Sequence, residues 1–188
     1  MLNRIYTSII NLAKTRYATA CLVVVAFTEA IFFPIPPDVI LVPMCLAKRS
    51  KALFYAGVTT LSSIVGGIVG YFIGLFLWSR IGLPLTNYLG YSDSIAEFSQ
   101  LYDEIGIIMI FLGAITPFPY KIVAIVSGAL GFPLFTFIFA SVTSRGLRFF
   151  AVAGLIYFFG KTIEAIVSRY LGIISLSLLV IIVGLYLY

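Results

Sequence analysis

Proline clusters interrupt two long apolar stretches of this chain, and they constrain its fold more than any other feature. The prolines are Pro34, Pro36 and Pro37 in the stretch 18–47, and Pro117 and Pro119 in the stretch 105–132. Each proline lacks a backbone N–H group and clashes with the helical turn before it, so no continuous helix passes through either cluster. Each stretch is therefore predicted to be either a broken helix that crosses or a hairpin that turns back.

The composition places these stretches in a membrane. Hydrophobic residues make up 62% of the chain and charged residues only 10%, which is too little polar surface for a water-soluble domain. Three further apolar stretches span 52–79, 133–160 and 171–188. Irregular backbone at membrane depth is tolerated only where it is buried in protein or lines a watery cavity. We therefore expect an all-α integral membrane protein whose breaks lie inside the helical bundle.

The distribution of basic residues predicts the topology. The net charge is +5, but the basic residues gather at the ends of apolar stretches, which is typical of membrane orientation and gives no reason to expect a nucleic-acid partner. The clusters on either side of the first stretch are Arg4, Lys14 and Arg16, and Lys48, Arg49 and Lys51. If the stretch returns to its own side, all six face the cytoplasm, as the positive-inside rule favours. This arrangement predicts a re-entrant hairpin and a cytoplasmic N-terminus.

An internal repeat relates the two proline clusters. Residues 34–38 (Pro-Ile-Pro-Pro-Asp) align with residues 117–121 (Pro-Phe-Pro-Tyr-Lys), and each is followed by an apolar run, a turn and a long apolar helix. Inverted repeats with broken helices are typical of secondary transporters. The predicted single membrane domain comprises an interfacial helix at 1–17, repeat 1 at 18–79, a polar connector at 80–104, repeat 2 at 105–160 and a C-terminal transmembrane helix at 161–188. Each repeat is expected to be a re-entrant hairpin followed by a transmembrane helix, in inverted topology.

Glycines recur in the apolar stretch 52–79. Gly66, Gly70 and Gly74 are spaced four residues apart. Small residues at this spacing let membrane helices approach each other closely. These glycines are predicted to be packing positions rather than substrate contacts.

Five charged side chains fall inside the apolar stretches: Glu29, Asp38, Lys121, Arg145 and Arg148. A charge at this depth is costly, and a functional role is its default interpretation. In one interpretation the charges only pair and hold the hairpins together, with Asp38 meeting Lys121 if the two tips meet. In the other they line a polar cavity, where the arginines bind a phosphate and Glu29 or Asp38 exchanges a proton. The two interpretations are compatible.

Three segments resemble motifs of the DedA family, also called the SNARE-associated or VTT domain family. They are residues 29–38 (Glu-Ala-Ile-Phe-Phe-Pro-Ile-Pro-Pro-Asp), 113–121 (Gly-Ala-Ile-Thr-Pro-Phe-Pro-Tyr-Lys) and 144–150 (Ser-Arg-Gly-Leu-Arg-Phe-Phe), the last of which resembles the YqaA-like branch. The resemblance covers residues 20–160. It implies that Glu29 and Asp38 are the two functional acids of the family, and that the protein moves a lipid across the bilayer. The family's usual arginines are replaced here by Ala114 and Tyr120, and Lys121, Arg145 or Arg148 is expected to supply the charge.

The first hypothesis for function is a membrane lipid translocator of the flippase or scramblase type. Its expected partners are a phospholipid or a polyprenyl phosphate, and protons exchanged through Glu29 or Asp38; a homo-oligomer is left open, and the expected location is the bacterial inner membrane. The alternatives are a transporter of a small ion or solute, and a membrane scaffold without transport. An enzyme is not expected, because the chain has no histidine for a Ser-His arrangement. Two cysteines without zinc or haem spacing give no reason to expect a metal or a cofactor.

Overall fold

Helices make up the described part of the protein, and no strand occurs in it. The computed structural model describes residues 17–89, 92–115 and 120–186, with most of the side chains up to Gly160. The helix predicted over residues 1–17 therefore lies outside the described residues, apart from Tyr17. The elements are α2 (Ala18–Glu29), α3 (Asp38–Ala47), η1 (Arg49–Lys51), α4 (Ala52–Leu77), η2 (Trp78–Gly82), α5 (Leu83–Leu89), α6 (Ser92–Ile115), α7 (Tyr120–Ala129) and α8 (Leu134–Tyr186).

The helical backbone stops at the first proline cluster and restarts directly after it. Helix α2 ends at Glu29, and the N–H groups of Ile31, Phe32 and Phe33 all donate to the carbonyl of Thr28 as the chain turns. Helix α3 begins at Asp38, with Pro37 before it in helical geometry. Proline suits this position, because the first N–H groups of a helix have no partner within the helix. Pro34, Pro36 and Pro37 thus lie in the link of an α2–α3 hairpin.

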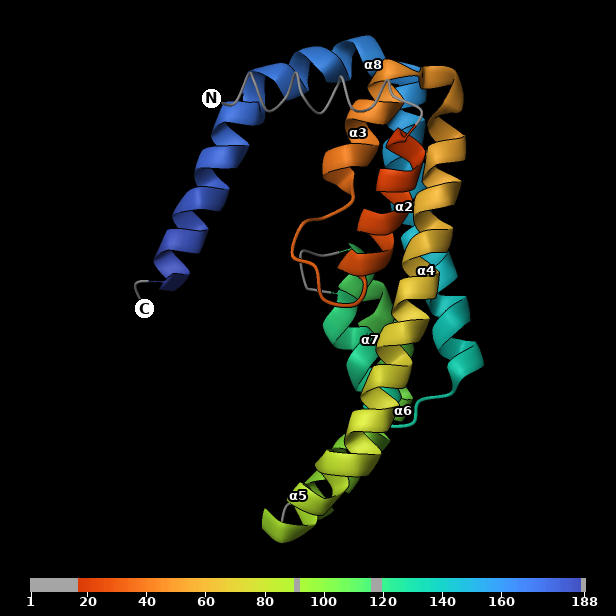
Figure 1. Cartoon of the computed structure of the whole chain (residues 1–188), viewed down its shortest axis with the longest axis vertical. Coiled ribbons are helices and arrows are strands. Elements are labelled where there is room, and N and C mark those ends of the chain that lie inside the picture. Colours follow the sequence, from red (N-terminus) through yellow and green to blue (C-terminus); the bar gives the residue numbers. More distant parts are fainter. Residues whose placement is uncertain (1–16, 90–91, 116–119, 187–188) are drawn as a thin grey trace.

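A second pair of helices, α6 and α7, surrounds the other proline cluster. Helix α6 runs without interruption from the predicted polar connector into the third apolar stretch, and α7 begins at Tyr120. Pro117 and Pro119 lie outside the described residues. In Figure 1 the α2–α3 hairpin occupies the upper part of the long axis, and α7 lies below it beside the lower half of α4.

Within the described part of the chain, two helices are long and apolar enough to cross a membrane. They span Arg49–Gly82, which comprises η1, α4 and η2, and Leu134–Gly160 in α8. Helix α8 has non-helical dihedral angles at Phe159 and continues as helical backbone to Tyr186. Figure 1 shows α4 running along the length of the bundle, next to the first part of α8. The all-α class is confirmed for the described residues, whereas the re-entrant nature of the hairpins, the side from which each would enter a bilayer and the inverted repeat stay predictions.

Each half of the chain packs against the long helix of the other half. Helix α3 contacts α8, and α7 contacts α4. Glycines permit close approaches of α4 to both α2 and α7, because a Cβ atom at Gly66 would lie 2.3 Å from the carbonyl oxygen of Phe27 in α2, and one at Gly74 would lie 1.9 Å from that of Ile125 in α7. The predicted packing role of the glycines is therefore confirmed at these positions. This interlocked packing brings α8 against the α2–α3 hairpin.

Candidate functional site

A layer of buried polar side chains separates two apolar cores of the bundle. One core includes Leu22, Leu41 and Phe149, and the other includes Tyr71, Ile110 and Phe137. Between them, α4 and α8 contribute side chains that are buried and polar: Thr59, Thr60, Ser63, Ser141, Ser144 and Arg145. Most of the hydroxyls bond carbonyls one turn back in their own helices, as isolated hydroxyls in membrane helices do. Arg145 is the charged member of this layer.

The inner ion pair joins Arg145 to Glu29. A terminal guanidinium nitrogen of Arg145, Nη2, donates to Oε2 of Glu29 at 2.5 Å, and the two side chains are 2% and 14% exposed. The Nε of Arg145 donates to the hydroxyl of Ser63 at 2.6 Å. Its guanidinium carbon also lies 4.4 Å from the centre of the Tyr120 ring, which is close enough for a cation–π contact. The Arg145 charge is therefore held from several sides by α2, α4 and α7.

The outer ion pair joins Arg148 to Asp38. The Nη2 of Arg148 donates to Oδ2 of Asp38 at 2.6 Å, and the two side chains are 31% and 23% exposed. The other carboxylate oxygen of Asp38, Oδ1, is buried and accepts no hydrogen bond from the residues that the structure describes. This carboxylate therefore keeps acceptor capacity for a proton or for a polar donor.

Local structure explains why two pairs form side by side. Arg145 and Arg148 are three residues apart on α8, so they project from the same face of that helix. The link of the α2–α3 hairpin separates Glu29 at the end of α2 from Asp38 at the start of α3, and each meets one arginine. Asp38 also lies in the first turn of α3, where the helix dipole favours a negative charge. The proline break is thus what presents both acids to one helix face.

Lys121 has a different partner from the one that the repeat alignment predicted. Its Nζ donates to the backbone carbonyl of Phe33 at 2.9 Å, in the link of the α2–α3 hairpin. Asp38 pairs with Arg148 instead, so the expected meeting of Asp38 with Lys121 is wrong. The physical reason is that Phe33 carries a carbonyl with no helical partner at the break, and a lysine ammonium satisfies it. Lys121 therefore ties the second half of the chain to the first break.

Sequence reasoning missed Ser63 and missed the role of Tyr120. Ser63 lies in a stretch interpreted only as apolar, although the hydroxyls of Thr59 and Ser63, four residues apart, mark one polar face. The sequence marks Tyr120 only as a residue at a position where the family usually has an arginine. Its buried hydroxyl donates to Ser141 at 2.8 Å, which fixes the ring against the guanidinium of Arg145.

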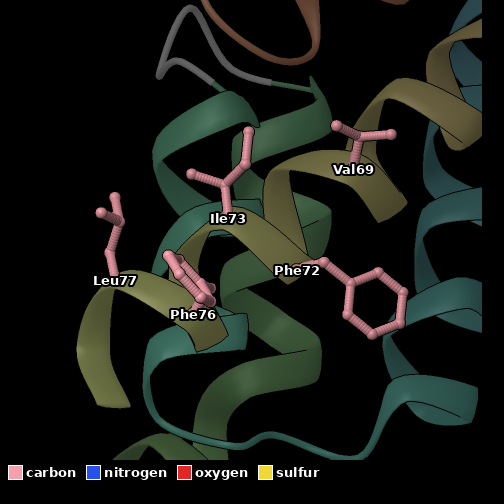
Figure 2. A pocket seen from close by; sticks show the side chains of 5 residues that line it. All are labelled: Val69, Phe72, Ile73, Phe76 and Leu77. Carbon is pink, nitrogen blue, oxygen red and sulfur yellow. The ribbon is translucent and has the colours of Figure 1, made fainter. Parts of the chain in front are cut away.

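Two open apolar grooves lie elsewhere, toward the far end of α4. The first groove encloses about 370 Å³, and Figure 2 shows the side chains that line it, all from α4: Val69, Phe72, Ile73, Phe76 and Leu77. The second groove encloses about 340 Å³ and lies between α4, η2 and α7, where it is lined by Gly74, Leu77, Trp78, Ile81, Gly82, Ile125 and Ala129. Neither groove is lined by a member of the two ion pairs.

Comparison with known proteins places these features in a family. The profile of the VTT domain matches residues 35–158. An uncharacterised protein of Haemophilus influenzae is 33% identical over 176 residues, which cover 94% of this chain and 91% of that protein. An uncharacterised protein of Histophilus somni is 33% identical over 183 residues, covering 97% and 95%, and one of Methanocaldococcus jannaschii is 24% identical over 140 residues, covering 74% and 84%. No solved structure matches this chain.

Proposed function

This chain belongs to the VTT domain family, also called the DedA family, and on that premise we propose that it is a lipid translocator of the flippase or scramblase type. The head group of a phospholipid or polyprenyl phosphate passes the polar layer of the bundle while the acyl or prenyl chains stay in the bilayer. The match is to the family as a whole, so membership of the YqaA-like branch stays a prediction. So do the bacterial inner membrane as location and the cytoplasmic N-terminus.

The outer ion pair is the observation that carries this proposal. Arg148 and Asp38 are partly exposed, lie beside a break in the helical backbone, and adjoin a buried pair in the middle of an apolar helix. Arg148 is 14 residues beyond Leu134, or about 21 Å along the helix axis, which is close to the middle of the 27-residue apolar span Leu134–Gly160. A guanidinium at this depth matches the oxygens of a phosphate group in a bidentate manner. The outer pair therefore supports transient binding of an anionic head group near the membrane centre.

A proton-coupled cycle follows from the chemistry of Asp38. A phosphate that binds Arg148 competes with the Asp38 carboxylate, and protonation of that carboxylate weakens its hold on the arginine. Asp38 is more exposed than Glu29, and its Oδ1 retains acceptor capacity. We therefore assign the proton exchange to Asp38 and a fixed role to Glu29. Proton coupling fails as a hypothesis if lipid flux is independent of pH in both the wild type and Asp38→Asn.

A second candidate function is a membrane scaffold without transport, and one set of contacts favours it. Glu29 with Arg145 and Asp38 with Arg148 are ion pairs, and Lys121 bonds a carbonyl of the hairpin link. Such contacts hold the two halves of the chain together whether or not a lipid passes between them. The two candidate functions therefore differ in whether the ion pair between Arg148 and Asp38 breaks while the protein works.

Lipid flux in proteoliposomes separates the candidates. The purified chain is reconstituted with fluorescent phospholipids or a labelled polyprenyl phosphate in one leaflet, and movement to the other leaflet is followed by chemical quenching. Faster movement than in protein-free vesicles, for at least one phosphate-bearing lipid, is the expected result. Flux of small ions through the same vesicles without lipid movement would favour the ion or solute transporter. No flux of either kind would leave the scaffold as the function.

A further inference from the structure

The two apolar grooves at the end of α4 are neighbours that share one side chain. Leu77 lines both, with Phe76 on the side of the first groove and Trp78 on the side of the second. The grooves have similar volumes, about 370 and 340 Å³. Phe72, Phe76, Leu77 and Ile81 are 40–60% exposed on this face, so it meets the lipid phase in a protein of this family. Leu77 therefore lies where the two apolar grooves meet.

A cation lies beside these grooves, beyond the last residue of the first and within the residue range of the second. Arg80 belongs to η2, a π-helical turn, and its side chain is exposed. Its guanidinium carbon lies 5.6 Å from the centre of the Phe76 ring, which lines the first groove. The apolar span Arg49–Gly82 ends two residues later, so Arg80 lies near the end of that span. π-Helical turns are frequent at functional sites, because the extra residue re-aims the side chains of that turn.

We propose that this surface binds an anionic phospholipid, with one acyl chain in each groove and the phosphate at Arg80. The two grooves have similar volumes and both border Leu77, so they offer apolar surface to the two acyl chains of one lipid. An arginine near the end of the apolar span recognises a phosphate by charge and by its paired donors. Arg80 lies 17 residues beyond Ser63, or about 25 Å along the helix axis. The site is therefore distinct from the ion pairs and does not depend on the proposed translocation.

Trp78 makes this site directly observable. It lines the second groove and is the single tryptophan of the chain. Bromine atoms on an acyl chain quench tryptophan fluorescence on contact. The full chain is reconstituted in vesicles that contain brominated phosphatidylglycerol in unbrominated phosphatidylcholine, and in vesicles with the bromine on phosphatidylcholine instead. The ratio of quenching gives the relative affinity for the anionic lipid at this position, with no transport measurement involved.

The expected preference for phosphatidylglycerol is about fivefold, the ratio that corresponds to one basic residue near an anionic lipid. Arg80→Gln is expected to reduce it to about one while quenching by brominated phosphatidylcholine stays unchanged, which shows that Trp78 still meets acyl chains. Lys51→Gln removes an exposed cation at the opposite end of α4 and is expected to keep the fivefold preference. Equal quenching by both lipids in the wild type overturns the proposal, and so does an undiminished preference in Arg80→Gln.

Discussion

The inner and outer ion pairs use the same chemistry, one arginine and one carboxylate, in different surroundings. Arg145 is 2% exposed and also bonds Ser63 and lies over the Tyr120 ring, whereas Arg148 is 31% exposed. A phosphate that reached Arg145 would have to enter a core where that side chain is almost fully buried, whereas Arg148 is partly exposed beside the hairpin break. In the proposed mechanism burial, rather than residue type, therefore separates the fixed charge from the exchangeable one.

Removing one member of the inner pair is expected to have the largest effect on stability. Glu29→Leu leaves the Arg145 charge buried without its carboxylate, which typically costs about 3–5 kcal/mol. Thermal unfolding in detergent measures this loss. The double variant Glu29→Leu with Arg145→Met removes both charges and is the matched control, because apolar replacement of a whole buried pair is often close to neutral. If the double variant is as unstable as the single one, the loss does not come from a stranded charge.

The hydroxyl of Ser63 offers an intermediate test of the inner pair. Ser63→Ala leaves the buried Nε–H of Arg145 without its acceptor and is expected to destabilise the protein by about 1–3 kcal/mol. Ser62→Ala is the control, because Ser62 bonds only the Val58 carbonyl of its own helix among the described residues. Its effect is expected to stay within about 0.5 kcal/mol. Equal losses in the two variants, measured by thermal unfolding, would mean that Ser63 gives Arg145 no specific support.

Sequence alone identified the break and the charges but not how the charges pair. Three prolines exclude a continuous helix through residues 34–37 on local geometry, and the helices accordingly end at Glu29 and restart at Asp38. Arg145 and Arg148 were recognisable because a charge in an apolar stretch is rare. Their partners lie 116 and 110 residues away along the chain. Helical spacing predicts which residues lie on the same side of a helix, but not which distant helix packs against that side.

The repeat alignment misassigned Lys121 for a related reason. Aligned positions in two repeats need not contact each other, because the contacts depend on how the halves dock. In this fold α3 packs on α8 and α7 on α4, so Asp38 of the first half meets Arg148 of the second. Ser63 escaped prediction because a hydroxyl in an apolar helix usually bonds its own backbone. Only the position of Arg145 in space gives that hydroxyl a second role.

The outer pair is expected to have a smaller effect on stability than the inner pair. Arg148 and Asp38 are more exposed than Arg145 and Glu29, so Arg148→Gln is expected to destabilise the protein by less than the minimum of about 3 kcal/mol that a stranded buried charge costs. Lys51→Gln, an exposed cation at the end of α4, serves as the charge-matched control for both stability and flux.

Lipid flux through Arg148→Gln in proteoliposomes is the most direct test of the proposed role of the outer ion pair. We expect at least a tenfold loss of phosphate-lipid movement, or about 1.4 kcal/mol, from a protein that remains folded, while Lys51→Gln moves lipid at the wild-type rate. Wild-type flux in Arg148→Gln would contradict lipid translocation through the outer pair, because the charge at the hairpin break would then have no part in transport.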